Sequence, residues 1–514
     1  MSAASVVAPL LLGIDLGTSS VKVLCVTCAG EVVGSGSAEY PVRAPQPGFA
    51  EQEAGLWWAA VQRAVRAAGA GHADAIAAVG LSGQMHGAVV LDGTGALLGN
   101  AIIWPDQRSA NQVRELTARV GAARLIETTG SPVATGFQAA TLLWLRTQRP
   151  ELFARIATVL APKDWLRLHM TGALATDAGD GSGTLMLDVQ ARDWSPALLE
   201  AVGVARSQLP AVRPSTEIAG ELLPAAAEAL GLRAHTPVVV GSADTACGML
   251  GAGTVESDTL LVNLSTGGQL VRPAAQPAVD TRGRLHTFCS ALAPGSGGAG
   301  WYQMGATLNV GMALRWLRTQ VLGWTGDDAY ARMTARAAEV PPGAGGLLFL
   351  PYLVGERTPL LDPAARAAFL GLAAAHSQAH LVRAVLEGAT FACYDAYRVL
   401  MEVGAGALPQ QVLLAGGGAR SLVWRQIVAD VFGVEVRRLL VTEQSALGAA
   451  LLAGHGAGLL DVAQAARTWA RLDAPLPPDP VRQARYTELF ALYTRAYPAN
   501  REIMHALGAL QNGI

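Results

Sequence analysis

Lysine is almost absent from this chain of 514 residues. Lys22 and Lys163 are the only two lysines, so 36 of the 38 basic residues are arginine. A phosphate-binding loop of the Walker type requires a glycine directly before its lysine, and Val21 and Pro162 occupy those positions here. P-loop chemistry is therefore excluded.

Signals for two other large enzyme classes are also missing. No serine lies in a Gly-x-Ser-x-Gly elbow, and the one Gly-x-Gly-x-x-Gly pattern, Gly295–Gly300, follows Pro294 rather than a strand. The sequence therefore gives no support to a serine hydrolase or to a Rossmann-type dehydrogenase.

The chain also lacks an excess of charge of either sign. Only 15% of the residues are charged, the net charge is −2 with the signs interspersed, and 51% of the residues are hydrophobic. The composition is typical of a large core in two or three domains, without a basic face for nucleic acid or a cationic helix for a membrane. We expect a small-molecule partner, no nucleic acid and no membrane.

Cysteines are few and odd in number. Five occur in the whole chain, and residues 1–9 lack the positive charge that begins a secretory signal. Cys25 and Cys28 have the spacing of zinc ligands, but the segment alternates like a strand and no second pair exists, so a zinc site is disfavoured. This pattern favours a reducing, cytoplasmic location.

The most informative segment that is present runs from Leu10 to Val23. An apolar strand brings Asp15 into the small-residue turn Gly17-Thr18-Ser19, and a second strand follows. Small residues let backbone N–H groups approach phosphate oxygens, and a carboxylate can hold the waters of a Mg²⁺ ion. A plain tight hairpin is the alternative.

A second segment repeats this pattern about half a chain later. Leu261–Gly268 has Asn263 where the first copy has Asp15, followed by the turn Ser265-Thr266-Gly267. Two similar strand-turn-strand units predict two related lobes that hold one nucleotide from opposite sides.

Several other predicted strands end in polar residues. Residues 75–81 lead into Ser82-Gly-Gln-Met-His-Gly87, which is either a functional turn or a hairpin with Met85 packed inward and His86 in solvent. Residues 101–104 end in Trp104, which beside Asp106 and Arg108 could line a sugar or could belong to the core.

Two later strands end in a carboxylate and in a glycine run. The strand 236–244 ends at Asp244, which could face a ligand crevice or cap a helix. The strand at 411–415 leads into Gly416-Gly-Gly418 and then into an amphipathic helix, and three successive glycines favour close approach of a nucleotide to the backbone.

Taken in order, these segments resemble the FGGY carbohydrate kinases from about residue 10 to about residue 455. The resemblance is carried by Asp15-Leu-Gly-Thr, Gly83-Gln-Met-His-Gly87, Trp104-x-Asp106, Pro162-Lys-Asp-Trp165, Gly241-x-x-Asp244, Phe349-Leu-Pro-Tyr-Leu-x-Gly-Glu-Arg-Thr-Pro359 and Gly416-Gly-Gly-Ala-Arg-Ser421. It implies an α/β fold of two actin-like (ribonuclease H-like) lobes around a cleft. The expected boundaries are 10–247 for the first lobe, 255–455 for the second and 456–514 for a helical tail.

The resemblance also implies roles for individual residues. Asp244 corresponds to the catalytic base, and Asp15 to the residue that organises Mg²⁺ and phosphate. The expected sugar contacts are Gln84, Met85, His86, Trp104, Asp106 and Asp244 itself, and the expected ATP contacts are Thr18, Ser19, Thr266, Gly267, Gly417, Gly418 and Ser421.

The implied reaction is ATP-dependent phosphorylation of a ketopentose, D-xylulose to D-xylulose 5-phosphate, by a chain that could act as a homodimer. Related substrates such as L-ribulose, gluconate or glycerol stay open. A different class, an actin- or chaperone-like ATP switch, shares the fold signals, but the 59 residues after the second lobe are too few for a peptide-binding domain.

Overall fold

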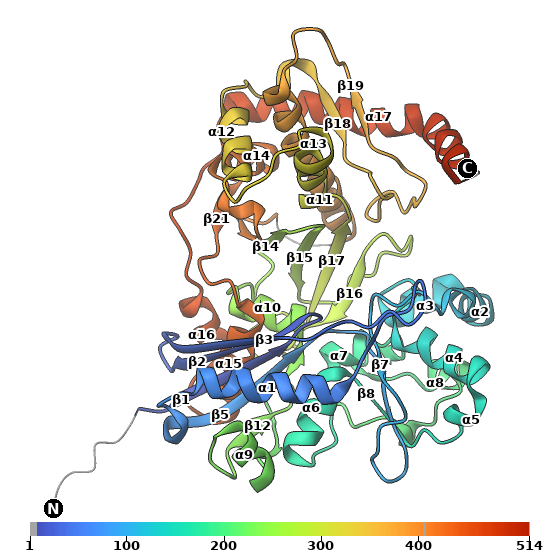
Figure 1. Ribbon diagram of the computed structural model, residues 1–514, viewed down its shortest axis with the longest axis vertical. Coiled ribbons are helices and arrows are strands. Elements are labelled where there is room, and N and C mark those ends of the chain that lie inside the picture. The colour runs from blue at the N-terminus through green and yellow to red at the C-terminus, as the bar shows by residue number, and fades with distance from the viewer. Residues whose placement is uncertain (1–7, 405–407, 513–514) are drawn as a thin grey trace, which may run out of the picture.

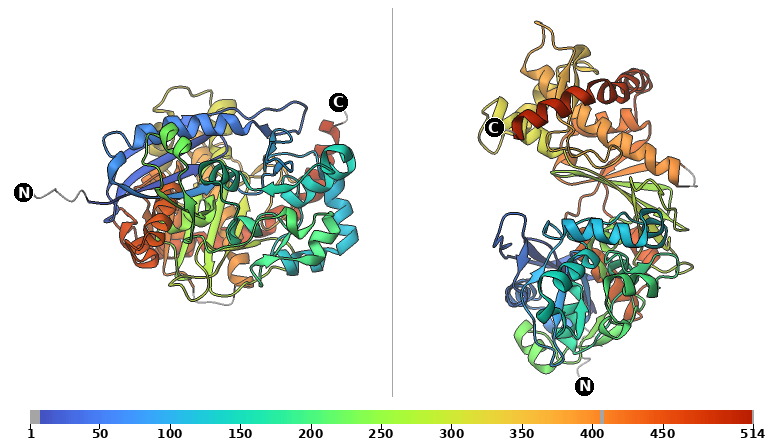
Figure 2. Two further views of the ribbon diagram at one scale, coloured as in Figure 1. Left: turned by 90° about the horizontal axis from the view of Figure 1, so that it is seen from below. Right: turned by 90° about the vertical axis from the view of Figure 1, so that its right-hand side faces the viewer.

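The computed structural model describes residues 8–404 and 408–512, and it divides into two α/β lobes stacked one above the other (Figure 1). The side view in Figure 2 shows the narrow waist between them. The expected two-lobed α/β architecture is confirmed.

The first lobe is built on a mixed seven-stranded sheet. Its strand order is β11-β12-β5-β1-β2-β3, and β13 also pairs with β5. Strand β1 is antiparallel to β2 and parallel to β5, and its residues 10–14 are fully or almost fully buried. The strands are β1 Leu10–Leu16, β2 Ser20–Thr27, β3 Val32–Glu39, β5 Ile76–Gly83, β11 Ile218–Glu221, β12 Pro237–Val239 and β13 Ser242–Ala243.

The second lobe repeats this arrangement. Its six-stranded sheet has the order β16-β17-β15-β14-β20-β21, with β14 antiparallel to β15 and parallel to β20. Strand β14 thus takes the place that β1 has in the first sheet, as the repeated sequence pattern predicts. The strands are β14 Thr259–Leu264, β15 Gly268–Ala274, β16 His286–Cys289, β17 Trp301–Thr307, β20 Gln411–Ala415 and β21 Glu435–Arg438.

Helices flank both sheets, and four further pairs of strands lie beside them. Around the first sheet are α1 Ala54–Ala68, α2 Ala110–Val120, α3 Ala122–Thr129, α4 Gln138–Gln148, α5 Pro150–Phe153, α6 Pro162–Thr171, α7 Ala178–Ser182, α8 Pro196–Val202 and α9 Pro224–Leu230. Around the second are α11 Gly311–Trp316, α12 Ala329–Ala338, α13 Gln378–Val403, α14 Leu422–Phe432 and α17 Pro480–Asn512. The pairs are β4 Glu51–Gln52 with β7 Ala101–Ile102, β6 Val89–Leu91 with β8 Thr158–Leu160, β9 Leu187–Asp188 with β10 Asp193–Trp194, and β18 Leu348–Leu350 with β19 Ala368–Leu370.

One helix lies in a different lobe from the one that the sequence suggests. Helix α15, Gln444–Gly456, follows the strands of the second lobe but packs on β1 and β5 of the first sheet (Figure 1). Gly13 and Gly80 permit this contact, because an added Cβ would lie 1.9 Å and 1.8 Å from the carbonyl oxygens of Ala446 and Ala449. The helix α16, Val462–Trp469, packs on α15. The chain returns to the second lobe after it, where Leu472 and Leu476 bridge to Leu439 and Val436.

The segment after β5 also differs from the hairpin alternative. Strand β5 ends at Gly83, and the next strand, β6, pairs with β8 rather than with β5. The residues Gln84–Gly87 therefore form a connection that leaves the main sheet.

Candidate active site

A cleft of about 260 Å³ lies between the two lobes and contains both carboxylates that the sequence singles out. Asp15 and Asp244 come from the first lobe, and the opposite wall comes from the second sheet. The lining residues are Asp15, Asp244, Thr245, Gly248, Leu261, Asn263, Gln269, Val271, Ala415, Gln444 and Ser445.

Asp15 lies near the end of β1, where it leaves the core. Its Oδ1 accepts a hydrogen bond of 2.8 Å from the hydroxyl of Ser82 on the neighbouring strand β5. Burial, followed by the charge of Asp244, raises its pKa to about 7. Two carboxylates facing one cleft repel each other, and a bound cation would reduce this repulsion.

Asp244 is the first residue of α10, Asp244–Gly251. Its Oδ1 accepts a hydrogen bond of 2.5 Å from the backbone N–H of Thr245, and burial raises its pKa to about 6. Ala243 takes the N-cap position, and no side chain caps the helix there. Asp244 is therefore the first helical residue rather than the N-cap, and its carboxylate lines the cleft.

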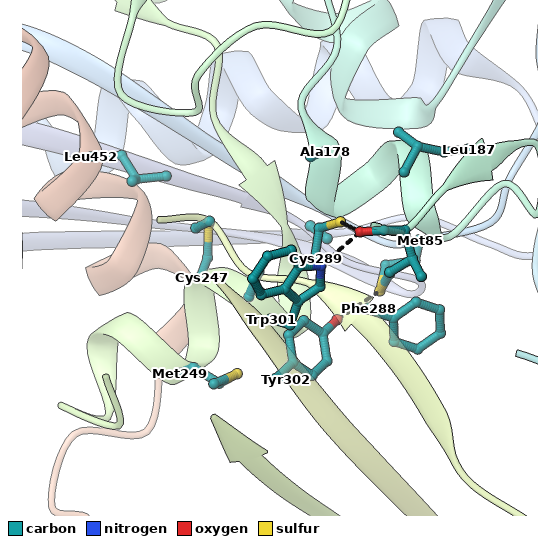
Figure 3. Packing of buried hydrophobic residues seen from close by; sticks show 14 of the residues in the cluster. Met85, Ala178, Leu187, Cys247, Met249, Phe288, Cys289, Trp301, Tyr302 and Leu452 are labelled. Carbon is teal, nitrogen blue, oxygen red and sulfur yellow. Dashed lines mark hydrogen bonds between the residues drawn. The ribbon is translucent and has the colours of Figure 1, made fainter. Parts of the chain in front are cut away.

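Gln84, Met85 and His86 lie in the connection after β5. The Gln84 amide donates to Gln52 Oε1 at 2.9 Å and to the Gly17 carbonyl at 3.3 Å, so it supports the β1–β2 turn, while its buried Oε1 has no partner among the described residues. Met85 is buried, and its sulfur accepts from the Tyr302 hydroxyl of the second lobe at 3.8 Å (Figure 3).

His86 has a backbone φ of 71°, which L-residues rarely adopt. Its Nδ1 lies 2.7 Å from the Gly183 carbonyl oxygen, and because a carbonyl only accepts, Nδ1 carries the proton and Nε2 is left as an acceptor. Burial lowers its pKa to about 4, so the ring is neutral at pH 7. The interpretation of His86 as a solvated hairpin residue is wrong.

Trp104 lies at the surface, whereas Asp106 is buried. Trp104 is 44% exposed, and its indole N–H donates to the Thr18 hydroxyl at 2.8 Å. Asp106 is fully buried, and its two oxygens accept from the Ala50 N–H at 2.6 Å and from the backbone and guanidinium of Arg108 at 2.9 Å. Because these donors occupy both oxygens, Asp106 fixes the loop after β7, and a sugar hydroxyl would have to displace one of them.

The two predicted phosphate turns do not belong to the lining of the cleft around Asp244. Thr18 lies in the β1–β2 turn with its carbonyl held by Gln52 at 2.6 Å, and Ser19 is exposed. Thr266 is exposed in the β14–β15 turn, and an added Cβ at Gly267 would lie 2.5 Å from the Thr307 carbonyl oxygen. None of these four residues lines the cleft around Asp244.

The three glycines after β20 do not share one role. An added Cβ at Gly416 would lie 2.4 Å from Asn263 Oδ1, and one at Gly418 would lie 2.8 Å from Leu264 Cβ, whereas one at Gly417 would meet nothing within 4 Å. Two of the three are therefore required by packing on β14. Ser421 caps α14, since its hydroxyl accepts from the Trp424 N–H at 3.2 Å.

Sequence reasoning missed several residues of the cleft. Gln269 lies on β15, and Gln444 and Ser445 begin α15. Only Asn263 carried a signal, as the counterpart of Asp15 in the repeat. Gln444 and Ser445 could not be found locally, because α15 reaches the cleft only by packing on the opposite lobe.

None of the helices within residues 8–404 and 408–512 combines the length and apolar character that crossing a bilayer requires. In the same residues, no group of three or more His, Cys, Asp or Glu side chains could hold a metal ion. All five cysteines are free thiols.

Comparisons with known proteins agree with this geometry. Residues 10–251 match the model of the N-terminal domain of the FGGY family of carbohydrate kinases, and residues 261–457 match that of its C-terminal domain. The chain is 40% identical to the xylulose kinase of Escherichia coli K12 over 86% of this chain and 89% of the relative, and 34% identical to that of Bacillus subtilis 168 over 97% and 98%. It is also similar to the crystal structure of a xyloylose kinase from Brucella ovis, with a TM-score of 0.89, 34% identity and coverage of 96% and 100%.

Proposed function

The chain belongs to the FGGY family of carbohydrate kinases, and on this basis we propose that it phosphorylates D-xylulose with ATP to give D-xylulose 5-phosphate and ADP. The observation that carries the proposal is the cleft between the lobes in which Asp244 faces residues of the second sheet. The xylulose kinases among its relatives support the choice of sugar.

Asp244 has the position and the acidity for a base that orients the attacking hydroxyl. The oxygen of the primary hydroxyl on C5 would form a bond to the γ-phosphorus while the bond to the β,γ-bridging oxygen breaks and ADP leaves. Because the proton moves late in a loose phosphoryl-transfer transition state, a carboxylate with a pKa of about 6 suffices to accept it.

The magnesium of MgATP belongs to the substrate, and Asp15 is the residue that would hold its waters. Carboxylate oxygens suit Mg²⁺, which keeps several of its waters. The bound ion supplies positive charge against the phosphate oxygens. Asp15 fits this role because it lies in the same cleft as Asp244 and its own charge is destabilised by that neighbour.

We place the nucleotide against the two hairpin turns and Gly417, whose α-carbon faces open space. Closure of the lobes on the sugar would exclude water from the transferring phosphoryl group. The free thiols and the use of ATP favour the cytoplasm as the location.

The decisive experiment measures ADP release from the purified protein with D-xylulose, L-ribulose, gluconate and glycerol. We expect the highest kcat/KM with D-xylulose and only slow ATP hydrolysis without sugar. Asp244→Asn should lower kcat by about 10²-fold or more. Activity of this variant close to that of the wild type would disprove the role of Asp244.

A matched control is Asp395→Asn. Asp395 is a carboxyl of α13 whose pKa burial also raises to about 6, but it does not line the cleft. Its substitution should leave kcat within about twofold. An ATP-switch protein, the alternative from another class, would release no more ADP with any sugar than without one.

A further inference from the structure

A second histidine, which shares the neighbour Phe288 with His86, is not used by the proposed mechanism. His286 begins β16, the edge strand of the second sheet, and its Nδ1 is buried without a hydrogen-bond partner among the described residues. A buried polar atom left unpaired costs free energy, so it needs an explanation.

The register of the second sheet places His286 on the face that lines the cleft. Residues directly opposite one another on paired strands point to the same side of a sheet. His286 is opposite Met304, Met304 is opposite Val271, and Val271 is opposite Leu261. Since Leu261 and Val271 line the cleft around Asp244, His286 lies at the end of the same row, two strands beyond Val271.

The first lobe meets this row with its own sugar-site residues. The His86 ring lies 4.0 Å from Phe137 and 6.0 Å from Phe288, between ring centroids, and His286 lies 6.2 Å from Phe137 and 5.5 Å from Phe288. The two imidazoles thus share the same two aromatic neighbours. Figure 3 shows Phe288 and Tyr302 of the second lobe beside Met85 of the first.

The lobes are already joined at this edge. The Thr287 N–H donates to the Gly130 carbonyl of the first lobe at 2.8 Å, and the Cys289 N–H donates to the Ser182 hydroxyl at 3.2 Å. Both donors follow His286 on β16, so the bonds fix its strand against the first lobe.

We propose that His286 is a sugar-binding residue, which with His86 holds the end of the ketose remote from the phosphorylated carbon and bonds its C1 hydroxyl. This inference rests on the proposed function. Asp244 marks the reacting end of the cleft, and the row of opposite residues from Leu261 to His286 leads away from it.

Both imidazoles are suited to an uncharged hydroxyl. Burial, then the charges of His86 and Arg357, lowers the pKa of His286 to about 3, and the ring is neutral at pH 7. A neutral imidazole has one donor and one acceptor nitrogen. The unpaired Nδ1 of His286 and the acceptor Nε2 of His86 could therefore satisfy the same hydroxyl group.

The test compares D-xylulose with 1-deoxy-D-xylulose, which lacks this hydroxyl, as substrates of the wild type and of His286→Phe. Phenylalanine keeps an aromatic ring that can stack on Phe288, as His286 does at an interplanar angle of 5°, and it removes both nitrogens. For D-xylulose we expect KM to rise about three- to tenfold with kcat within about twofold. For 1-deoxy-D-xylulose we expect the variant and the wild type to have the same kcat/KM.

Phe288→Leu is the matched control, because it disturbs the same cluster without removing a polar atom. It should change kcat/KM for both sugars by the same factor. His286→Asn retains a polar group at the position and should show a smaller loss on D-xylulose than His286→Phe, which also provides a readout if the phenylalanine variant does not fold.

An equal loss on both sugars in His286→Phe, or no loss on either, would overturn the inference. A wild-type protein that does not phosphorylate D-xylulose would instead overturn the proposed function, so the two failures are distinguishable.

Discussion

The hydroxyl of Ser445 donates a hydrogen bond of 2.9 Å to the backbone carbonyl of Asp244, although 201 residues separate the two in the sequence. The bond joins the first residue of α10 to the first turn of α15. The two helices cross closely: an added Cβ at Gly448 would lie 1.9 Å from the Cys247 carbonyl oxygen, and one at Gly251 would lie 2.0 Å from that of Gln444. The position of Asp244 therefore depends on a helix that follows the second lobe.

Gly448→Ala tests this crossing. Because the new methyl group would overlap a backbone atom, the helices must separate, and we expect the free energy of unfolding to fall by about 1–3 kcal/mol in urea denaturation. Gly93→Ala is the control, since an added Cβ there would meet nothing within 4 Å, and its stability should stay within about 0.5 kcal/mol of the wild type. Equal stability of the two variants would contradict the crossing.

The parts of the fold that follow from local pattern were predictable. The two hairpins, β1–β2 and β14–β15, appear as apolar runs around small-residue turns, and Asp15 and Asp244 follow because each lies at a strand end. The location of α15 was not predictable, since its residues 446–454 are buried on all sides and show no single apolar face. Gln444 and Ser445 of the cleft depend on that location.

The glycine run after β20 shows a second limit of sequence reasoning. Gly416, Gly417 and Gly418 have identical side chains, so a pattern assigns them one role, whereas the structure separates two packing positions from one open position. The buried contacts of Asp106 show the same limit, because its ion-pair partner Arg108 lies near it in sequence, whereas Ala50, whose backbone N–H also donates to it, does not.

The same glycine run gives the second prediction. Gly417→Ala should leave the free energy of unfolding unchanged and raise KM for ATP about tenfold, because a methyl group would enter the space that we assign to the nucleotide. Gly416→Ala should instead lower stability, since Gly416 has a φ of 84° and an added Cβ would overlap Asn263. ATP kinetics and thermal unfolding of both variants decide this, and an unchanged KM in Gly417→Ala would place the nucleotide elsewhere.

The two lysines give the third prediction, because one is buried and the other is exposed. Lys163 Nζ lies 2.7 Å from Asp164, 3.3 Å from Asp177 and 3.2 Å from Asp180, all buried. Burial alone would lower its pKa, but these three charges outweigh it and raise the pKa above its usual value. Lys163→Met would leave Asp177 and Asp180 without a buried cation, although Asp164 keeps Arg167 at 3.0 Å, and we expect a loss of about 3–5 kcal/mol in the free energy of unfolding.

Lys22 is the natural comparison for Lys163. It pairs with Glu443 at 2.7 Å, but the two side chains are 43% and 29% exposed. Lys22→Met should cost less than about 1 kcal/mol in the same denaturation experiment, because solvent screens an exposed pair. Similar losses in both variants would show that the buried ion pairs of Lys163 stabilise the fold no more than the exposed ion pair of Lys22 does.

The pH dependence of the reaction gives the last prediction. Asp244 must be a carboxylate to accept the proton, and burial raises its pKa to about 6, so kcat/KM should fall about tenfold between pH 7 and pH 5 and tenfold per unit below that. Stability should change in the opposite direction. Because the pKa values of both Asp15 and Asp244 are raised in the folded state, the protein binds more protons than the unfolded chain, and their contribution to the free energy of unfolding is full below about pH 4 and is lost as the pH rises through 6 and 7. Ser82→Ala, which removes a hydrogen bond from Asp15 and none from Asp244, should leave the acid limb of kcat/KM in place. A limb centred near pH 4 would mean that another carboxyl accepts the proton.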